Sequence, residues 1–352
     1  MSTWPELPTQ PPPQSHPTAS PAASPDSRPT VVVTHPILEP GPTLLKEACE
    51  LRILPNQYRH PPDLLRKAAE GARGMVTQLM DPIGEEILST PGLKVVANVA
   101  VGYDNIDVTA ATKYGVMVCN TPGVLDDTTA DFAFALMMAA GRRLLEGDRF
   151  VRTGAFKGWA IDMLLGHDVW GATLGIVGFG RIGRGVAKRA RAFGMKVLYY
   201  DEQPAEPDVE REMGVSRTDL YRLLSESDFV SVHVPLTATT RHLFSTAQFA
   251  TMKPTAVLVN TSRGPVVDEA ALAEALRSHQ IFGAGLDVYE NEPDVNPELL
   301  KLDNVILTPH IASASVRTRS EMSEMAARNL ITGVRGGRPP NIVNPEVFNQ
   351  QR

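Results

Sequence analysis

Short runs of aliphatic and β-branched residues alternate with helical stretches along the first third of the chain. The runs at 31–33, 74–79, 93–99 and 116–119 are expected to be strands, because each is short, apolar and bounded by turn-forming residues. Strands that alternate with helices favour a mostly parallel sheet covered by helices. This part of the sequence therefore predicts an α/β unit.

A second series of the same kind begins at residue 173. Helical stretches at 182–193 and 268–278 separate some of its strands. The strands are expected at 173–177, 196–200, 229–233, 256–260, 281–287 and 305–308. Six parallel strands with helical crossovers are the content of a doubly wound dinucleotide-binding domain. The predicted fold class is thus α/β, with two similar doubly wound domains.

Two further helices stand out by their patterns. The segment 127–141 is apolar on most faces, and a helix without a polar face is buried, so we expect it between the two domains. The segment 313–335 is long and amphipathic, and a Pro/Gly-rich end follows it.

The first thirty residues have a different composition from the rest of the chain. They hold nine of its 29 prolines, with Ser, Thr and Ala between them. So little apolar surface cannot offset the entropy of ordering, which predicts a disordered tail at 1–30. The tail lacks the features of a secretory or mitochondrial leader, and no apolar run in the chain approaches the roughly 20 residues of a membrane span. A cytoplasmic protein is expected.

Charge and cysteine usage exclude several classes of function. The 34 Lys and Arg residues against 40 Asp and Glu give a formal net charge of −6, which argues against a general nucleic-acid surface. The two cysteines, Cys49 and Cys119, rule out a disulfide scaffold and a four-thiolate zinc site.

A glycine motif follows the apolar strand at 173–177 and precedes a predicted helix. It consists of Gly178, Phe179, Gly180, Arg181, Ile182 and Gly183. In a GxGxxG motif the first glycine allows a tight turn, the second lets the backbone approach a pyrophosphate, and the third permits close packing of helix on strand. The free N–H groups at the start of the helix favour phosphate binding. This setting predicts a dinucleotide site.

The choice between the two dinucleotides depends on the end of the next strand. Asp201 lies there, eighteen residues after Gly183, where a carboxylate accepts hydrogen bonds from ribose hydroxyls and repels a 2′-phosphate. Glu202 follows, and no Arg or Lys occurs before Arg211. NAD(H) is therefore expected to be preferred over NADP(H).

Three later segments place polar groups at the carboxyl ends of strands, where open α/β sheets bind ligands. Arg263 follows the strand at 256–260, and its planar fork suits a carboxylate or a carbonyl oxygen. His310 follows the last apolar strand and is a candidate acid–base group. A carboxylate partner would stabilise the protonated imidazole. Either Asp287 or Glu292 could be that partner, and spacing does not choose between them.

Taken in order, these motifs resemble the D-isomer-specific 2-hydroxyacid dehydrogenases, most of all the glyoxylate and hydroxypyruvate reductase branch. The resemblance spans 31–343. It rests on the segments 101–107, 120–125, 178–183, 233–237, 260–269, 287–293 and 308–313. It implies NAD(H)-dependent reduction of a small 2-keto acid to the D-2-hydroxy acid.

The family's catalytic roles then transfer to matching positions. Arg263 would hold the keto oxygen and carboxylate of the substrate, and His310 would donate the proton. Glu292 would pair with His310, and Asp287 would bind the nicotinamide carboxamide. No catalytic metal is expected, because Arg263 and His310 supply the polarisation.

The resemblance also implies binding positions outside this group. Backbone N–H groups of Val101 and Gly102 would bind the substrate carboxylate. Cofactor contacts are implied for Thr129, Val234, Pro235, Thr240 and Thr261. Trp159 matches a tryptophan that reaches the neighbouring subunit's site in a dimer, although the proline that follows it in the family is missing. A homodimer is expected.

The implied domain plan is a discontinuous substrate domain, 31–125 and 310–346, around a NAD-binding domain at 126–309. Several alternatives stay open at this point. Glu292 argues against a formate-oxidising relative, and too few residues follow Arg335 for a long 3-phosphoglycerate dehydrogenase. A phosphite-oxidising relative is compatible with these residues. So is a NAD-sensing binding protein, like the corepressors that share this fold, with the proline-rich tail as an interaction arm.

Overall fold

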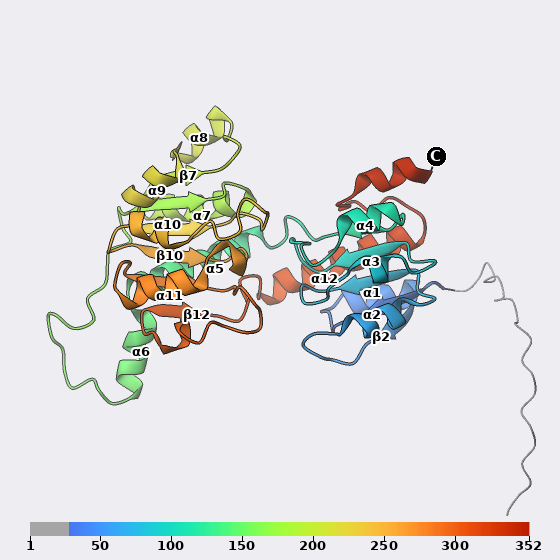
Figure 1. Cartoon of the computed structure of the whole chain (residues 1–352), viewed down its shortest axis with the longest axis horizontal. Coiled ribbons are helices and arrows are strands. Elements are labelled where there is room, and N and C mark those ends of the chain that lie inside the picture. Colours follow the sequence, from blue (N-terminus) through green and yellow to red (C-terminus); the bar gives the residue numbers. More distant parts are fainter. Residues whose placement is uncertain (1–27, 352) are drawn as a thin grey trace, which may run out of the picture.

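Two parallel sheets organise residues 28–351, which the computed structural model describes (Figure 1). The predicted α/β fold class with two doubly wound units is confirmed. The predicted tail lies outside the described residues as far as residue 27, and the first strand already includes Thr30.

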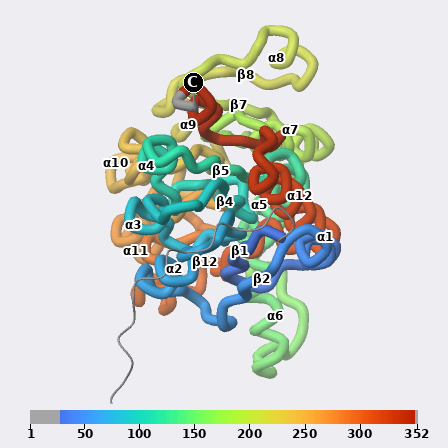
Figure 2. The backbone as a smooth tube through the Cα atoms, turned by 90° about the vertical axis from the view of Figure 1, so that its right-hand side faces the viewer, coloured from blue at the N-terminus to red at the C-terminus, as the bar shows by residue number. Residues whose placement is uncertain are grey.

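The five-stranded sheet has the order β2-β1-β3-β4-β5, with all neighbours parallel. Its strands are β1 (Thr30–Val33), β2 (Glu50–Ile53), β3 (Gly74–Thr77), β4 (Val95–Asn98) and β5 (Met117–Cys119). Its helices are α1 (Gly41–Ala48), α2 (Pro62–Ala69), α3 (Glu85–Leu88) and α4 (Val108–Lys113), joined by α12 (Val316–Val334) from the end of the chain. Figure 2 shows α2, α3 and α4 on one side of this sheet and α1 and α12 on the other.

The side chains of β1 alternate between the two faces of the sheet, and this explains why the lobe has a hydrophobic core on each face. Val32 packs with residues of α2, α3 and α4, whereas Val31 and Val33 pack with residues of α1 and α12. Because successive side chains of a strand point to opposite faces, a fully apolar strand requires helices on both sides.

The seven-stranded sheet has the order β12-β11-β10-β9-β6-β7-β8, again parallel throughout. Its strands are β6 (Thr173–Val177), β7 (Lys196–Tyr200), β8 (Val215–Arg217), β9 (Phe229–Val232), β10 (Val257–Asn260), β11 (Gly283–Leu286) and β12 (Val305–Leu307). Helices α5 (Asp126–Gly141) and α7 (Arg181–Ala192) share a core on one face. On the other face lie α9 (Leu220–Glu226), α10 (Thr246–Thr251) and α11 (Glu269–Arg277). Helix α8 (Pro207–Met213) precedes β8.

Two strands were not expected from the sequence, and both are edge strands. The prediction of six strands in the second sheet was wrong, because β8 adds a seventh. Strand β2 is largely exposed, and only one of the three residues of β8 is buried. Edge strands that face solvent lack the apolar pattern by which a buried strand is recognised.

The apolar helix α5 does not lie between the lobes. It packs on α7 and on strands β10 and β11, so its apolar faces are buried within the seven-stranded lobe. The chain returns to the five-stranded lobe at its end, where Ile342 bridges Cys119. Within residues 28–351, no helix has both the length and the apolar character that a membrane crossing requires.

Candidate active site

The carboxyl ends of both sheets carry the polar segments that the sequence singled out. In the seven-stranded sheet the glycine motif follows β6, and the loop containing Val234 follows its neighbour β9. The chain extends from β6 toward β7 on one side and returns through β9 on the other. Such a switch point opens a crevice at the carboxyl edge of a parallel sheet, where ligands bind.

The glycine motif has the geometry that a pyrophosphate site needs. Gly178 has φ +98°, and an added Cβ would lie 2.6 Å from the His233 carbonyl carbon. An added Cβ on Gly183 would lie 2.2 Å from the Gly178 oxygen. Gly180, in contrast, has open space above it and caps α7 without a side-chain hydrogen bond, so the first N–H groups of this helix are free for an anion.

The other predicted cofactor positions surround this motif. Thr261 follows β10, and its buried hydroxyl has no hydrogen-bond partner, as expected of a group that awaits a ligand. Thr240 lies in the turn after β9, where its hydroxyl donates to the Pro235 carbonyl. Thr129 is buried in the first turn of α5. Ile182 is half-buried, and the exposed Arg181 pairs with Asp126 at 3.0 Å. A dinucleotide fits these residues.

Asp201 does lie beside the glycine motif, where its carboxylate accepts the Phe179 N–H at 2.7 Å and the Gln203 N–H at 3.1 Å. The structure adds a basic group that the sequence analysis missed. Arg217, at the end of β8, donates to the carbonyl oxygens of Asp201 and Glu202 at 2.9 and 3.2 Å. Because β8 was not predicted, nothing in the sequence placed this guanidinium at the end of β7.

His310 and Glu292 meet at the carboxyl edge of the same sheet. Nδ1 of His310 lies 2.9 Å from Oε2 of Glu292, and the Tyr289 N–H donates to the other carboxylate oxygen at 3.0 Å. The His310 backbone has φ +54°, a left-handed conformation that His242 and His279 also adopt in this chain. The His310 side chain is 30% exposed, and its contact with Glu292 uses Nδ1, not Nε2.

Asp287 holds the loop that carries His310. Its carboxylate is fully buried and accepts hydrogen bonds from the N–H groups of Ile311 and Ala312 and from the Thr308 hydroxyl, at 2.7 to 2.8 Å. Burial raises the pKa of Asp287 above its usual range, although these hydrogen bonds act in the opposite direction. Of the two carboxylates that spacing left open, Glu292 therefore contacts the His310 ring and Asp287 contacts its backbone neighbours.

Arg263 reaches from the seven-stranded lobe to the other lobe. Its Nε donates to Asp104 at 2.8 Å, and its Nη1 donates to the Ser262 carbonyl at 2.9 Å. Its Nη2 lies 1.5 Å from the position a Cβ would take on Gly102, so the guanidinium rests directly against the backbone of the 98–105 loop. Val101, also in this loop, is half-buried, and its carbonyl accepts from Asn120.

Tyr58, on the loop between β2 and α2, is exposed, and its pKa is raised, first by the partial burial of its hydroxyl and second by the charge of Glu292. Trp159 lies away from these groups. It belongs to the segment after α6 (Leu144–Arg152), on the far side of the seven-stranded lobe, and is 78% exposed (Figure 1).

This arrangement can bind and protonate a small oxoacid. A guanidinium, a loop of backbone amides and an imidazole paired with a carboxylate lie around the junction of the two lobes. A fixed guanidinium and a protonated imidazole stabilise negative charge that develops on a carbonyl oxygen. The adjacent glycine motif offers a place for a dinucleotide.

Comparison with known proteins points to one family. A family described as "D-isomer specific 2-hydroxyacid dehydrogenase, NAD binding domain" matches residues 134–312. A glyoxylate reductase of Korarchaeum cryptofilum is 53% identical over 324 residues, which cover 91% of this chain and 97% of the relative.

Solved structures agree with this finding along most of the chain. A protein from Thermus thermophilus is 42% identical with a TM-score of 0.82, covering 89% of this chain and 99% of its own. An NADPH-dependent glyoxylate/hydroxypyruvate reductase from Sinorhizobium meliloti, solved with NADP and malonate, is 34% identical with a TM-score of 0.78. It covers 90% of this chain and 97% of its own.

Proposed function

The chain belongs to the D-isomer specific 2-hydroxyacid dehydrogenase family of oxidoreductases, and on that premise we propose that it reduces glyoxylate, or a 2-keto acid of similar size, to the 2-hydroxy acid with NAD(H). The observation that carries the proposal is the pairing of His310 with Glu292 at the edge where Arg263 meets the Gly102 loop. The names of the similar reductases support the substrate class.

Arg263 and the 98–105 loop bind the substrate in this proposal. The guanidinium turns toward the substrate's carboxylate and keto oxygen, and the backbone N–H groups of Val101 and Gly102 hold the carboxylate from the other lobe. A bound nicotinamide supplies or accepts the hydride. Because these groups belong to two lobes, binding orients the substrate between them and excludes water.

His310 supplies the proton. Its Nε2 donates to the keto oxygen as negative charge develops there, and Glu292 keeps the ring oriented and stabilises its protonated form. Asp287 fixes the loop through the Ile311 and Ala312 N–H groups. Its contact with the nicotinamide carboxamide stays a prediction, since its three hydrogen bonds already engage both carboxylate oxygens.

The division of labour between the lobes follows the domain plan predicted above. We infer that 126–309 binds the dinucleotide and contributes Arg263 to the substrate, and that 31–125 together with 310–346 supply the other substrate-binding groups. The helix-start amides beside Gly180 and the free hydroxyl of Thr261 support the first assignment. The return of α12 to the five-stranded lobe supports the second.

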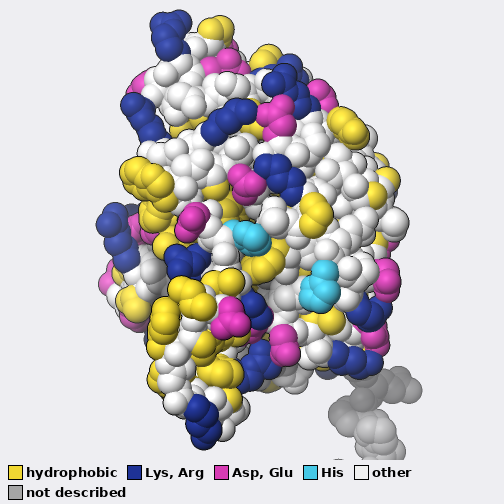
Figure 3. Space-filling model, turned by 90° about the vertical axis from the view of Figure 1, so that its left-hand side faces the viewer, with side chains coloured by type: hydrophobic (Ala, Val, Ile, Leu, Met, Phe, Trp, Pro, Cys, Tyr) yellow, Lys and Arg dark blue, Asp and Glu magenta, His cyan; other side chains and the backbone are white. Residues whose placement is uncertain are grey.

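We further propose NAD(H) as the preferred dinucleotide and a homodimer as the working form. The Asp201 carboxylate supports the preference for NAD(H), whereas the guanidinium of Arg217 at the same strand end favours NADP(H). For the dimer, α5 leaves Met138 as its one exposed large hydrophobic residue, whereas the arm formed by α6 and the segment 153–170 exposes many. Its exposed apolar residues are Leu144, Leu145, Val151, Phe156, Trp159, Ile161, Leu165 and Trp170. An apolar surface of this extent marks an interaction site. Figure 3 views the seven-stranded lobe from the side away from the other lobe, and hydrophobic side chains gather on its lower part.

A panel of 2-keto acids, each offered with NADH and with NADPH, tests the proposal. We expect the highest kcat/KM for NADH oxidation with glyoxylate or hydroxypyruvate, and lower values as the side chain of the keto acid grows. Binding of NADH without oxidation by any keto acid would contradict the proposal and favour a cofactor-sensing protein.

A further inference from the structure

Three buried side chains form a separate cluster in the five-stranded lobe. His35 follows β1, His60 lies in the loop between β2 and α2, and Asp81 follows β3; their exposed fractions are 8%, 0% and 0%. Nε2 of His35 lies 3.0 Å and Nδ1 of His60 lies 3.2 Å from the same oxygen, Oδ1 of Asp81. One candidate ligand atom from each residue lies within 4.8 Å of the other two. The proposed reaction uses none of these groups.

Both ring nitrogens of His60 face hydrogen-bond acceptors. Its Nδ1 faces the Asp81 carboxylate, and its Nε2 lies 3.0 Å from the Pro55 carbonyl oxygen. Both partners can only accept, whereas a neutral imidazole has a single N–H. Either a second proton or a metal ion at Nδ1 resolves this conflict. With a metal ion, the neutral ring keeps its one proton on Nε2, which then donates to Pro55.

The surrounding contacts are those that orient metal ligands. Metal-bound histidines commonly donate their other N–H to a backbone carbonyl, and ligating carboxylates are themselves hydrogen-bonded. Here Oδ2 of Asp81 accepts from the Thr34 hydroxyl and from the Gln78 N–H, which leaves Oδ1 for another partner. Ligands held at about 2.0–2.1 Å in a tetrahedral zinc site lie roughly 3.3 Å apart. The two separations from Oδ1 of Asp81, 3.0 and 3.2 Å, are close to that value, and the two imidazole nitrogens lie within 4.8 Å of each other.

We propose that Nε2 of His35, Nδ1 of His60 and Oδ1 of Asp81 bind a divalent transition-metal ion of the Zn²⁺ type. Imidazole with carboxylate suits zinc and its neighbours, whereas Mg²⁺ and Ca²⁺ prefer sites made wholly of oxygen. Three protein ligands leave a fourth position for water. His35 is the least buried of the three residues, so its side of the cluster is where that water and the entering ion have access.

The bound ion has a structural role, because it ties together loops that reach the proposed active site. The Asn105 amide donates to the carbonyl oxygens of Gln78 and Asp81, at 3.1 and 2.9 Å. It therefore joins the loop after β3, which carries Asp81, to the 98–105 loop. The ion thus stabilises the five-stranded lobe without entering the reaction.

Metal binding to the full, untagged chain tests the proposal directly. After removal of metal with a chelator, Co²⁺ is added as a spectroscopic probe and Zn²⁺ as its competitor. We expect one equivalent of Co²⁺ per chain, with the intense visible bands of a tetrahedral ion, and their loss when Zn²⁺ is added. The midpoint of thermal unfolding should rise by about 3 °C or more at saturating Zn²⁺. A folded chain that shows only the weak bands of hydrated Co²⁺ overturns the proposal.

A matched pair of variants locates the site. His35→Gln retains a group that can donate to Asp81 and removes a ligand, so it should weaken Co²⁺ binding by at least about 10-fold. His279→Asn changes an exposed histidine elsewhere and should bind as the unchanged chain does. Equal binding by His35→Gln and the unchanged chain would overturn the assignment. If His35→Gln fails to fold, the Co²⁺ spectrum of the unchanged chain still shows whether a tetrahedral metal site is present.

Discussion

Arg263 and Asp104 form an ion pair of 2.8 Å that joins the two lobes at the carboxyl edges of their sheets. Arg263 follows β10 and Asp104 lies in the loop after β4, so the pair brings the guanidinium against the backbone that is proposed to bind the substrate carboxylate. With Nε held by Asp104 and Nη1 by the Ser262 carbonyl, Nη2 is the atom directed at Gly102. The position of Arg263 therefore depends on the absence of a side chain at residue 102.

Gly102→Ala should reduce activity without unfolding the protein. The added Cβ would lie 1.5 Å from Nη2, and a long, flexible side chain will move away at little cost in stability. Displacing a substrate-binding group by about 1 Å can cost roughly 100-fold in rate, so we expect kcat/KM for glyoxylate to fall by about that factor. Gly147→Ala is the control, because a Cβ there meets open space. Equal kcat/KM values for the two variants would contradict the placement of Arg263.

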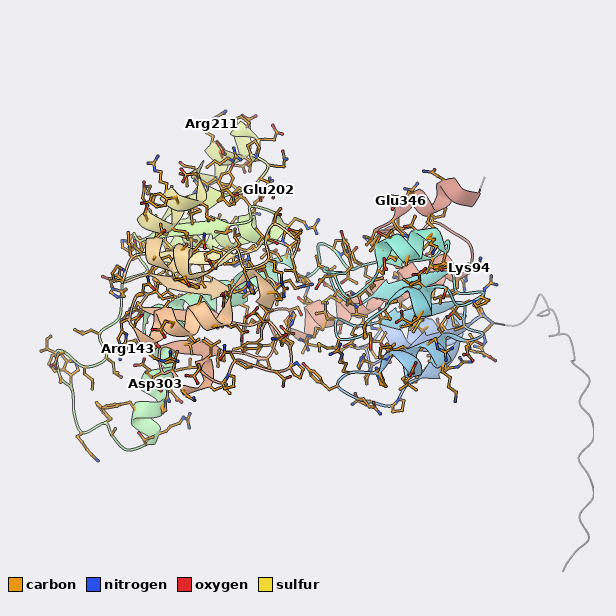
Figure 4. The ribbon with its side chains drawn as sticks, viewed as in Figure 1. Lys94, Arg143, Glu202, Arg211, Asp303 and Glu346 are labelled. Carbon is orange, nitrogen blue, oxygen red and sulfur yellow. The ribbon has the colours of Figure 1, made fainter. Side chains whose placement is uncertain are left out.

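The preference for NAD(H) should depend on Asp201. Asp201→Ser removes the charge that repels a 2′-phosphate and leaves Arg217 at the same strand end, so the ratio of kcat/KM for NADPH to that for NADH should rise at least about 10-fold. Adding Arg217→Gln should reverse much of this gain. Figure 4 shows Glu202 and Arg211 on the same upper part of the lobe. Asp208→Ser, a change at an exposed carboxylate nearby that pairs with Arg211, serves as the control. An unchanged ratio in Asp201→Ser would refute the role given to this carboxylate.

Stability at mildly acidic pH should depend on His233. Burial lowers the pKa of His233 to about 3, whereas the unfolded chain binds this proton near pH 6.5. Between these values the unfolded state holds more protons, so the contribution of His233 is complete above about pH 6.5 and is lost progressively as the pH falls toward 3.

Urea unfolding at pH 7.5 and pH 5 measures this effect. His233→Gln keeps a group that can bond to the Ser231 hydroxyl but does not titrate. The loss of unfolding free energy on acidification should be smaller in this variant by an amount on the order of 1 kcal/mol. The same loss in both proteins would show that His233 is protonated in the folded state.

The arm formed by α6 and the segment 153–170 should carry the dimer. Leu144 and Ile161 are 63% and 77% exposed, and burying such residues against a second copy would remove them from water. Arg143 and Asp303 lie at the base of this arm (Figure 4). Sedimentation equilibrium at micromolar concentration should give a dimer for the unchanged chain and a monomer for Leu144→Glu/Ile161→Glu. Tyr221→Glu, at an exposed aromatic residue of α9, should remain dimeric. A monomeric unchanged chain would contradict the proposal.

The buried strands were predictable from sequence because a strand that is buried on both faces has a continuous run of apolar residues. Strands β6 and β7 begin and end where the pattern predicted. The edge strands β2 and β8 face solvent and left no such pattern, and with β8 the position of Arg217 was also missed. The family resemblance was confirmed by the match over 134–312 and by relatives that cover most of the chain.

Contacts between distant segments set the limit of what the sequence revealed. Spacing could not choose between Asp287 and Glu292 as the partner of His310, because the choice depends on how the loop after β12 folds back over β11. The ion pair of Arg263 with Asp104 joins residues 159 positions apart. The cluster of His35, His60 and Asp81 likewise forms only when three loops meet.

The role of His310 is tested most directly by His310→Asn, measured for glyoxylate reduction with NADH alongside His279→Asn as control. Positioned acid–base groups contribute about 10²- to 10⁴-fold to rate, so kcat should fall by that factor, while NADH affinity and the far-UV circular dichroism spectrum stay unchanged. Loss of kcat with retained cofactor binding is the result that the pairing of His310 with Glu292 predicts. Full glyoxylate reductase activity in His310→Asn would contradict the account.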